Sequence, residues 1–290
     1  MPNRFVVALA AIAVSGPLWA QAELLSETTW NVRDPRFGGM SALEVTEDGG
    51  AFVALSDRAA VAHGTLVRTD GIISGIALET LEDLPLIQPP RESRNLGDAE
   101  GLAGEVGGRL HISFESVHRV DVYDGFDGTP RSLPAAPQFR TFPVNDGAEA
   151  LAIDPTGAVF VIPEKLRRRR TSFPVLRHRD GTWDRPFRII ATEGLAPVGA
   201  DFGPDGALYL LERSFHGIFG FASRVRRFAP DATGEVFGEV ILHTDPGVHD
   251  NLEGLAVWRD GDGALRLTMI SDDNFNFVQR TQIVEYRLTP

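Results

Sequence analysis

Cysteine is absent from this 290-residue sequence, and lysine occurs once, at Lys165. Without cysteine the chain can form neither disulfide bonds nor thiolate metal sites. Nearly all of its positive charge is arginine, and the acids outnumber these cations to give a formal net charge of −12. An acidic chain without a basic stripe argues against a nucleic-acid partner, whereas it is compatible with the binding of a cation.

Long apolar runs are also lacking after the first 22 residues. Residues 1–22 carry one cation, Arg4, then an apolar stretch, and they end in Ala20-Gln21-Ala22, a small-x-small cleavage signal. This pattern predicts a secretory signal peptide over 1–22, whose apolar core is too short to be a membrane span. We therefore expect one domain over 23–290, without a membrane span, as a periplasmic or secreted monomer.

What the sequence does contain is a repeated unit, seen most clearly over residues 149–164. It consists of an apolar strand, a tight Asp-Pro-Thr-Gly turn and a second apolar strand, with an acid at each end. Proline and glycine set the backbone angles of the turn, and the β-branched and aromatic flanks favour strands. Because the two strands are antiparallel, Glu149 and Glu164 are expected at the same edge of the hairpin.

The unit recurs five times, at intervals of 49 to 59 residues. The five first strands begin at Ser41, Glu100, Glu149, Val198 and Glu253, and the five second strands end at Asp57, Glu115, Glu164, Glu212 and Asp272. A period near fifty with several strands per period is typical of an all-β fold, the β-propeller. We expect five blades, with six as the alternative, and a strand over 24–32 that completes the last blade and closes the ring.

The first strand of each propeller blade lines the central channel, so these acids would converge at one mouth. Converging carboxylates repel one another, and a bound divalent cation would remove that repulsion; oxygen ligands in a flexible ring suit calcium. The expected ligands of Ca²⁺ are Ser41, Glu100, Glu149 and Glu253. The residues expected to orient water or outer ligands are Asp57, Glu164, Glu212 and Asp272. The alternative is that these acids are solvated or paired with the neighbouring cations.

Those neighbouring cations have a second use, because Arg58, Lys165 and Arg213 directly follow three of the acids. There they could hold an anionic substrate group such as a phosphate, although ordinary charge pairing along the strands would also explain them. A metal and arginines around a water are typical of phosphoester hydrolysis. The sequence contains no G-x-S-x-G, P-loop or H-E-x-x-H motif, which argues against a standard serine hydrolase, P-loop NTPase or zincin.

Several of these segments resemble a known family. They are Phe37-Gly38-Gly39-Met40-Ser41-Ala42-Leu43, Leu55-Ser56-Asp57-Arg58, Asp98-Ala99-Glu100-Gly101-Leu102, Gly147-Ala148-Glu149-Ala150-Leu151, Leu210-Leu211-Glu212-Arg213-Ser214-Phe215, Asn251-Leu252-Glu253-Gly254-Leu255 and Ile270-Ser271-Asp272-Asp273-Asn274-Phe275. In their order and residue pattern they resemble the phytase-like family of exported bacterial proteins, labelled "esterase-like activity of phytase". The resemblance implies a β-propeller and a hydrolase.

A second likeness is to the calcium-activated nucleotidases (apyrases), which have five blades and a central calcium held by serine and glutamate. Ser41, Glu100, Glu149 and Glu253 stand where that pattern has ligands, and Val198 departs from it. The leading hypothesis is an exported phosphoester hydrolase with a divalent cation at the channel mouth. The alternatives are a calcium-dependent lactonase or carboxylesterase, with a channel carboxylate or His249 as base, and a non-catalytic binding propeller.

Overall fold

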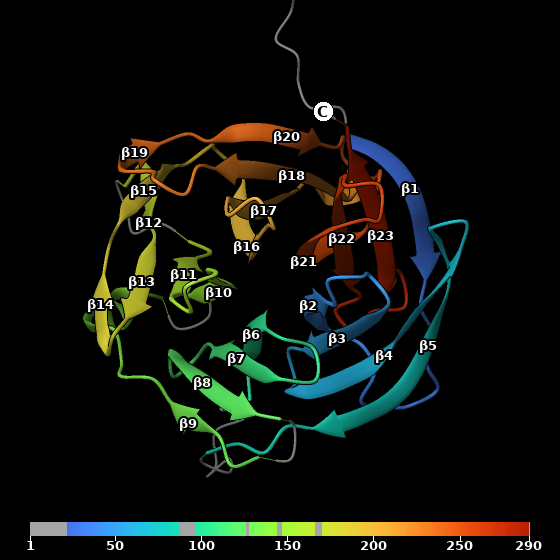
Figure 1. Cartoon of the computed structure of the whole chain (residues 1–290), viewed down its shortest axis with the longest axis horizontal. Helices are drawn as coiled ribbons and strands as arrows, with labels where there is room; N and C mark the ends of the chain where they lie inside the picture. The colour runs from blue at the N-terminus through green and yellow to red at the C-terminus, as the bar shows by residue number, and fades with distance from the viewer. Residues whose placement is uncertain (1–21, 88–96, 126–127, 144–146, 166–169, 290) are drawn as a thin grey trace, which may run out of the picture.

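The computed structural model of the protein describes residues 22–87, 97–125, 128–143, 147–165 and 170–289. These residues form β-strands and two short 3₁₀ helices, η1 (Pro137–Thr141) and η2 (Gly217–Phe219). The strands make six small sheets arranged in a ring (Figure 1), which confirms the predicted β-propeller. The predicted signal peptide lies outside the described residues except for Ala22, so it stays a prediction.

Five of the sheets have four antiparallel strands each, and each grows outward from a strand beside the axis. The first sheet contains β2 (Met40–Val45), β3 (Ala51–Ser56), β4 (Ala60–Thr69) and β5 (Ile72–Asp83), and the second contains β6 (Ala99–Gly104), β7 (Arg109–Phe114), β8 (Arg119–Asp124) and β9 (Arg131–Ser132). The third contains β10 (Ala148–Ile153), β11 (Val159–Pro163), β13 (Leu176–Arg179) and β14 (Thr182–Asp184). The fourth contains β16 (Ala196–Phe202), β17 (Leu208–Phe215), β18 (Phe221–Phe228) and β20 (Glu239–His243). The fifth is β21 (Asn251–Arg259), β22 (Leu265–Asp272), β23 (Gln282–Leu288) and β1 (Ala22–Thr29). The inner strands β2, β6, β10, β16 and β21 contact one another in turn around the axis.

The sixth sheet makes the count six, the alternative number, rather than the five that we favoured. It contains β12 (Ser172–Pro174), β15 (Phe187–Ile190) and β19 (Gly234–Val236), and β15 pairs with β19 in parallel. These strands lie on the outer part of the ring (Figure 1) and carry no copy of the hairpin unit. The favoured count was wrong because it rested on that unit alone.

The N-terminal strand closes the ring, as predicted. β1 pairs antiparallel with β23, from Ala22 opposite Leu288 to Thr29 opposite Gln282. This pairing covers the outer edge of β23 and joins the two ends of the chain in one sheet. Side chains of residues Trp30, Met40 and Ile283 share one apolar cluster, so the core also joins the two ends of the chain.

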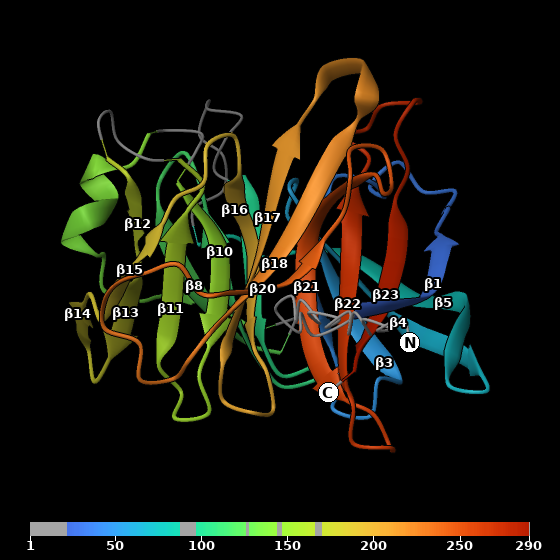
Figure 2. The ribbon, with the colours of Figure 1, turned by 90° about the horizontal axis from the view of Figure 1, so that it is seen from above.

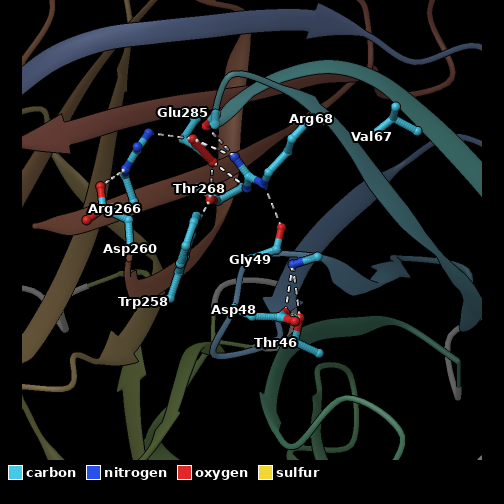
Figure 3. Close-up of polar contacts among 12 residues, drawn as sticks. Thr46, Asp48, Gly49, Val67, Arg68, Trp258, Asp260, Arg266, Thr268 and Glu285 are labelled. Atoms are coloured by element: carbon cyan, nitrogen blue, oxygen red, sulfur yellow. Dashed lines mark hydrogen bonds and ion pairs between the residues drawn. The ribbon is translucent and has the colours of Figure 1, made fainter. Parts of the chain in front are cut away.

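A polar network at the hairpin-turn end joins the first blade to the last (Figure 3). The fully buried carboxylate of Glu285 on β23 accepts hydrogen bonds from Arg68 at 2.7 Å and from Arg266 at 3.0 Å. The Arg68 guanidinium also lies over the Trp258 ring, 4.8 Å from its centroid, and donates to the carbonyl of Gly49 at 2.8 Å. Because a buried carboxylate needs such partners, this network favours the closed ring.

Candidate metal centre at the channel mouth

A β-bulge interrupts each of the five inner strands at the position that the repeat singled out. On β10 the pairs are Ala148 with Pro163 and Ala150 with Ile162, so Glu149 is an extra residue without an opposite partner. The same shift occurs at Ser41, at Glu100 with Gly101, at Val198 and at Glu253. A bulge re-aims the side chain of the extra residue and bends its strand. The five repeats therefore carry the same local distortion, whatever residue occupies it.

Glycine after the bulge lets neighbouring inner strands come close together. A Cβ on Gly101 would lie 2.4 Å from the carbonyl oxygen of Glu149, and a Cβ on Gly199 would lie 2.3 Å from that of Glu253. Real Cβ atoms do not approach carbonyl oxygens so closely, so alanine would push the two strands apart. This packing explains the recurring small residue after the acid and sets how closely the acids approach one another.

Three carboxylates are close enough to share one metal ion. Oxygen atoms of Asp98, Glu100 and Glu115 all lie within 4.8 Å of one another. Burial, reinforced by repulsion from Glu253 and Glu115, raises the pKa of Glu100 well above its ordinary value. Burial also raises the pKa of Glu115 to about 7, against the lowering effect of a hydrogen bond from the Gly147 amide. Such a group of desolvated oxygen ligands fits a hard cation.

The next two bulge acids belong to the same electrostatic cluster. Burial raises the pKa of Glu149 well above its ordinary value, and repulsion from Glu100 and Glu115 adds to that effect. Burial likewise raises the pKa of Glu253, while the Arg213 guanidinium lowers it. The predicted ligands Glu100, Glu149 and Glu253 are therefore close enough at one mouth for their charges to repel one another.

Ser41 lies at the equivalent bulge on β2 and is buried. Its hydroxyl donates to the carbonyl oxygen of Ala99 at 2.9 Å, on the next inner strand. The hydroxyl proton is therefore used between two blades, and the oxygen keeps lone pairs that a cation could share.

The acids that close the second strands form an outer group. Burial raises the pKa of Asp57 to about 6 and that of Asp272 to about 8, with further repulsion from Glu253 on Asp272. Asp272 accepts a hydrogen bond from the amide of Asn274 at 2.6 Å. Glu164 forms ion pairs with Lys165 at 3.8 Å and with Arg213 at 3.5 Å. These three predicted residues lie beside the bulge acids.

Glu212, the fourth acid of that group in the sequence, lies elsewhere. In the third blade, Ala148 stands directly before the bulge and pairs with Pro163, and the outer acid Glu164 follows Pro163. The outer acids of the first, second and fifth blades stand at the same position. In the fourth blade Glu212 is itself that partner, opposite Pro197, and Arg213 takes the position of the acid. A shift of one residue along a strand moves a side chain to the other face of the sheet.

The carboxylate of Glu212 is fully buried between two arginines of the neighbouring strand. It accepts hydrogen bonds from Arg224 at 2.8 Å and from Arg226 at 2.5 Å, and the Arg226 side chain is fully buried as well. These ion pairs hold the fourth sheet together and leave Glu212 outside the carboxylate cluster. The repeat contained the signal for the shift, since Arg213, like Glu115 and Glu164, stands seven residues after its turn glycine.

Of the three predicted anion-holding cations, Arg213 is the one that enters the cluster. Its Nη1 lies 2.8 Å from Glu253 Oε1, and it also hydrogen-bonds the side chain of Asn251. Arg58 is exposed and stacks on the Phe275 ring, 3.3 Å from the centroid. Lys165 is also largely exposed, at the edge of the site beside Glu164. Among the described residues the mouth is therefore strongly acidic, and the largely buried guanidinium of Arg213 lies within it.

Two residues that the sequence reasoning did not select complete the site. Asp98 and Asn251 each stand two residues before a bulge glutamate, and Asn251 donates to Glu253 Oε1 at 2.8 Å. Their shared place in the repeat was a signal that could have identified them. Further from the cluster, His249 uses both ring nitrogens, Nδ1 with Glu27 Oε2 and Nε2 with the Tyr286 hydroxyl, each at 2.6 Å.

The fold and this mouth define a class of protein, a β-propeller with a cluster of carboxylates at one end of its axis. Residues 35–275 match the family model Phytase-like, described as esterase-like activity of phytase. The chain therefore belongs to the Phytase-like family, as the resemblance predicted. Within the described part of the chain, no helix has the length and apolar character needed to cross a bilayer.

Several solved structures are similar to this chain at low sequence identity. An α-L-arabinofuranosidase from Podospora anserina has a TM-score of 0.53 at 9% identity, with 92% of this chain and 96% of that chain covered. A luciferin-regenerating enzyme has a TM-score of 0.47 at 11% identity, covering 91% and 95%. A gluconolactonase from Xanthomonas campestris has 0.43 at 14% identity, covering 83% and 69%. No curated protein matches the sequence at a significant level.

Proposed function

We propose that this protein is an exported hydrolase that cleaves a phosphoester with a divalent cation, Ca²⁺, held at the channel mouth. The observation that carries the proposal is a cluster of carboxylates at the mouth. Asp98, Glu100 and Glu115 of the second blade lie at ligand distance from one another, and Glu149 and Glu253 from two other blades repel Glu100 or are repelled by it. Mutual repulsion in such a cluster is relieved either by protons or by a cation. A hard divalent ion fits because the donors are carboxylate oxygens.

Each group of residues has a role in this proposal. Glu100, Glu149 and Glu253 hold the ion, with Ser41, Asp98 and Glu115 as further oxygen donors. When bound, the ion would polarise a phosphoryl oxygen and acidify a water molecule. Arg213 offsets part of the acidic charge at the mouth and gives the phosphoryl group a guanidinium partner.

The outer acids handle the proton of the attacking water. Asp57, whose pKa is raised to about 6, is suited to accept it, and Asp272, whose pKa is raised to about 8, is suited to give a proton to the leaving alcohol. Glu164 keeps Arg213 in place. The water oxygen bonds to phosphorus, the ester P–O bond breaks, and the departing alcohol oxygen takes up a proton. Glu212 was expected to orient water or outer ligands, but it has no role in this proposal because its carboxylate is enclosed by Arg224 and Arg226.

Hydrolysis of a carboxylic ester or lactone is the second candidate. It is favoured by the family description and by the partly apolar cavity beside the mouth. A channel carboxylate would serve as base in that reaction, because both nitrogens of His249 are occupied by Glu27 and Tyr286.

The experiment is a substrate panel of phosphoesters, lactones and aryl esters, assayed with Ca²⁺ and with a chelator. We expect phosphoester turnover that the chelator abolishes and that Glu149→Gln lowers by at least tenfold. Asp262→Asn is the matched control, because its carboxylate is 79% exposed in a hairpin turn away from the mouth. Turnover that chelator and Glu149→Gln leave unchanged would refute the proposed role of the ion. Calcium-dependent stabilisation without turnover on any substrate would instead indicate a binding propeller.

A further inference from the structure

A cavity of about 1010 Å³ opens directly beside the carboxylate cluster. Arg213 belongs to both, since it lines the cavity and pairs with Glu253 at 2.8 Å. The volume corresponds to the upper end of pockets for drug-sized ligands, roughly 300–1,000 Å³. A molecule whose anionic group reaches Arg213 could therefore place the rest of its body in this space.

One wall of the cavity is the hairpin of β17 and β18, which projects beyond the rest of the ring (Figure 2). Its strands stay paired up to Phe215 opposite Phe221, whose rings lie 5.0 Å apart, and η2 forms its tip. The tip is apolar and open to solvent, with Ile218 96% and Phe219 69% exposed. Apolar side chains gathered at the end of a projecting hairpin are typical of a binding surface.

Two further segments line the cavity, namely the approach to β21, which pairs with the hairpin through Phe221 and His249, and the loop between β22 and β23. Val248 is 49% exposed before β21, and Val278 is 66% exposed in the loop between β22 and β23. Polar groups line the inner part, where Arg213 and Asp250 lie, and Asp250 holds the loop by accepting from the Arg280 amide at 2.8 Å. The cavity is therefore amphipathic, with a guanidinium at the catalytic end and apolar walls at the outer end.

We propose that this cavity binds the apolar part of the substrate, so that the protein prefers esters of alkyl or aryl alcohols to phosphates of sugars and polyols. This inference rests on the proposed function and names its substrate class. Burial of an apolar chain between Phe219 and Val278 would add affinity, whereas a hydroxylated body would lose hydrogen bonds to water without replacing them. The charged group would remain at Arg213 and the cation.

The test compares ethyl, butyl and octyl phosphate with glycerol phosphate, using the full protein with Ca²⁺. We expect KM to fall by up to about fourfold for each buried methylene group, with little change in kcat. Phe219→Ser and Val278→Ser should each raise KM for octyl phosphate by about tenfold and leave ethyl phosphate unaffected. Val67→Ser is the matched control, because Val67 is 46% exposed on β4 and does not line the cavity. Equal KM values along the series, or equal effects of all three variants, would overturn the inference.

Binding separates this inference from the proposed function. Calorimetric titration with octylphosphonate and methylphosphonate needs no turnover. Tighter binding of octylphosphonate that Phe219→Ser weakens, in a protein that hydrolyses no ester, would support the cavity assignment and refute the hydrolase. Equal binding of the two phosphonates would overturn the cavity assignment, and so would binding of phosphatidylcholine vesicles through the same side chains without any preference for octylphosphonate.

Discussion

Replacing Arg213 by methionine removes a buried cation from the carboxylate cluster and leaves Glu253 without its ion-pair partner. The two groups are 2.8 Å apart, and their side chains are 22% and 10% exposed. Breaking one side of such a buried pair costs about 3 kcal/mol, because the remaining charge stays desolvated. For a chain of this size that corresponds to a fall in Tm of roughly 6–12 °C.

The loss should depend on pH. The pKa of Glu253 is already raised by burial and is lowered by Arg213, so removal of Arg213 raises it further. A carboxyl group with a raised pKa stabilises the folded state at low pH and loses that contribution as pH rises through the folded-state value. The destabilisation by Arg213→Met should therefore be large at pH 8 and small at pH 5.

The assay is urea unfolding in the presence of a chelator at both pH values. Arg213→Met with Glu253→Gln should be less destabilised at pH 8 than Arg213→Met alone, because the unpaired charge is gone. Arg109→Met is the matched control, since its partner Asp124 is 62% exposed and the pair is solvated; we expect no measurable change. A loss for Arg213→Met that equals the control, or that does not vary with pH, would refute the reasoning.

Three further predictions concern packing, protons and the excluded acid. Gly101→Ala should destabilise by about 2 kcal/mol, measured by urea unfolding, whereas Gly261→Ala, with open space around it, should be neutral; equal effects would contradict the close strand approach. The raised pKa values of Glu115 (about 7) and Asp272 (about 8) predict that Tm in chelator falls as pH rises from 5 to 9, and that Ca²⁺ raises Tm more at pH 8 than at pH 5. A rise in the chelator series would be incompatible with them. Glu212→Gln should cost about 3 kcal/mol and leave the Ca²⁺-induced shift in Tm intact; loss of that shift would return Glu212 to the site.

The hairpin could be predicted from the sequence because it depends on interactions between residues that are close together in the chain. A turn glycine with apolar strands around it specifies an antiparallel pair, and five copies at a period near fifty indicate a closed ring. For the same reason Ser41, Glu100, Glu149, Val198 and Glu253 could be placed at equivalent positions, and all five prove to be bulge residues. The strand near the N-terminus that closes the ring could be predicted because the last repeat had too few strands to complete its blade.

The register beyond the turn was not readable with the same precision. The acid–cation pair Glu212-Arg213 looks equivalent to Asp57-Arg58 and Glu164-Lys165, yet the fourth hairpin places the arginine where the others have the acid. Alternation along a strand has period two, so an error of one residue exchanges the two faces. The sixth sheet escaped notice for a different reason, because its pairing of β15 with β19 is parallel and non-local.

The most direct test of the central claim is calcium binding by the purified protein, measured by isothermal titration calorimetry after chelation and dialysis. We expect saturable binding of one ion per chain at the mouth, together with a rise in Tm of about 5–10 °C at a hundredfold excess over Kd. Glu100→Gln and Glu149→Gln should both weaken it, while Asp262→Asn leaves it unchanged. The absence of binding at pH 8, or binding that both cluster variants retain, would contradict the account.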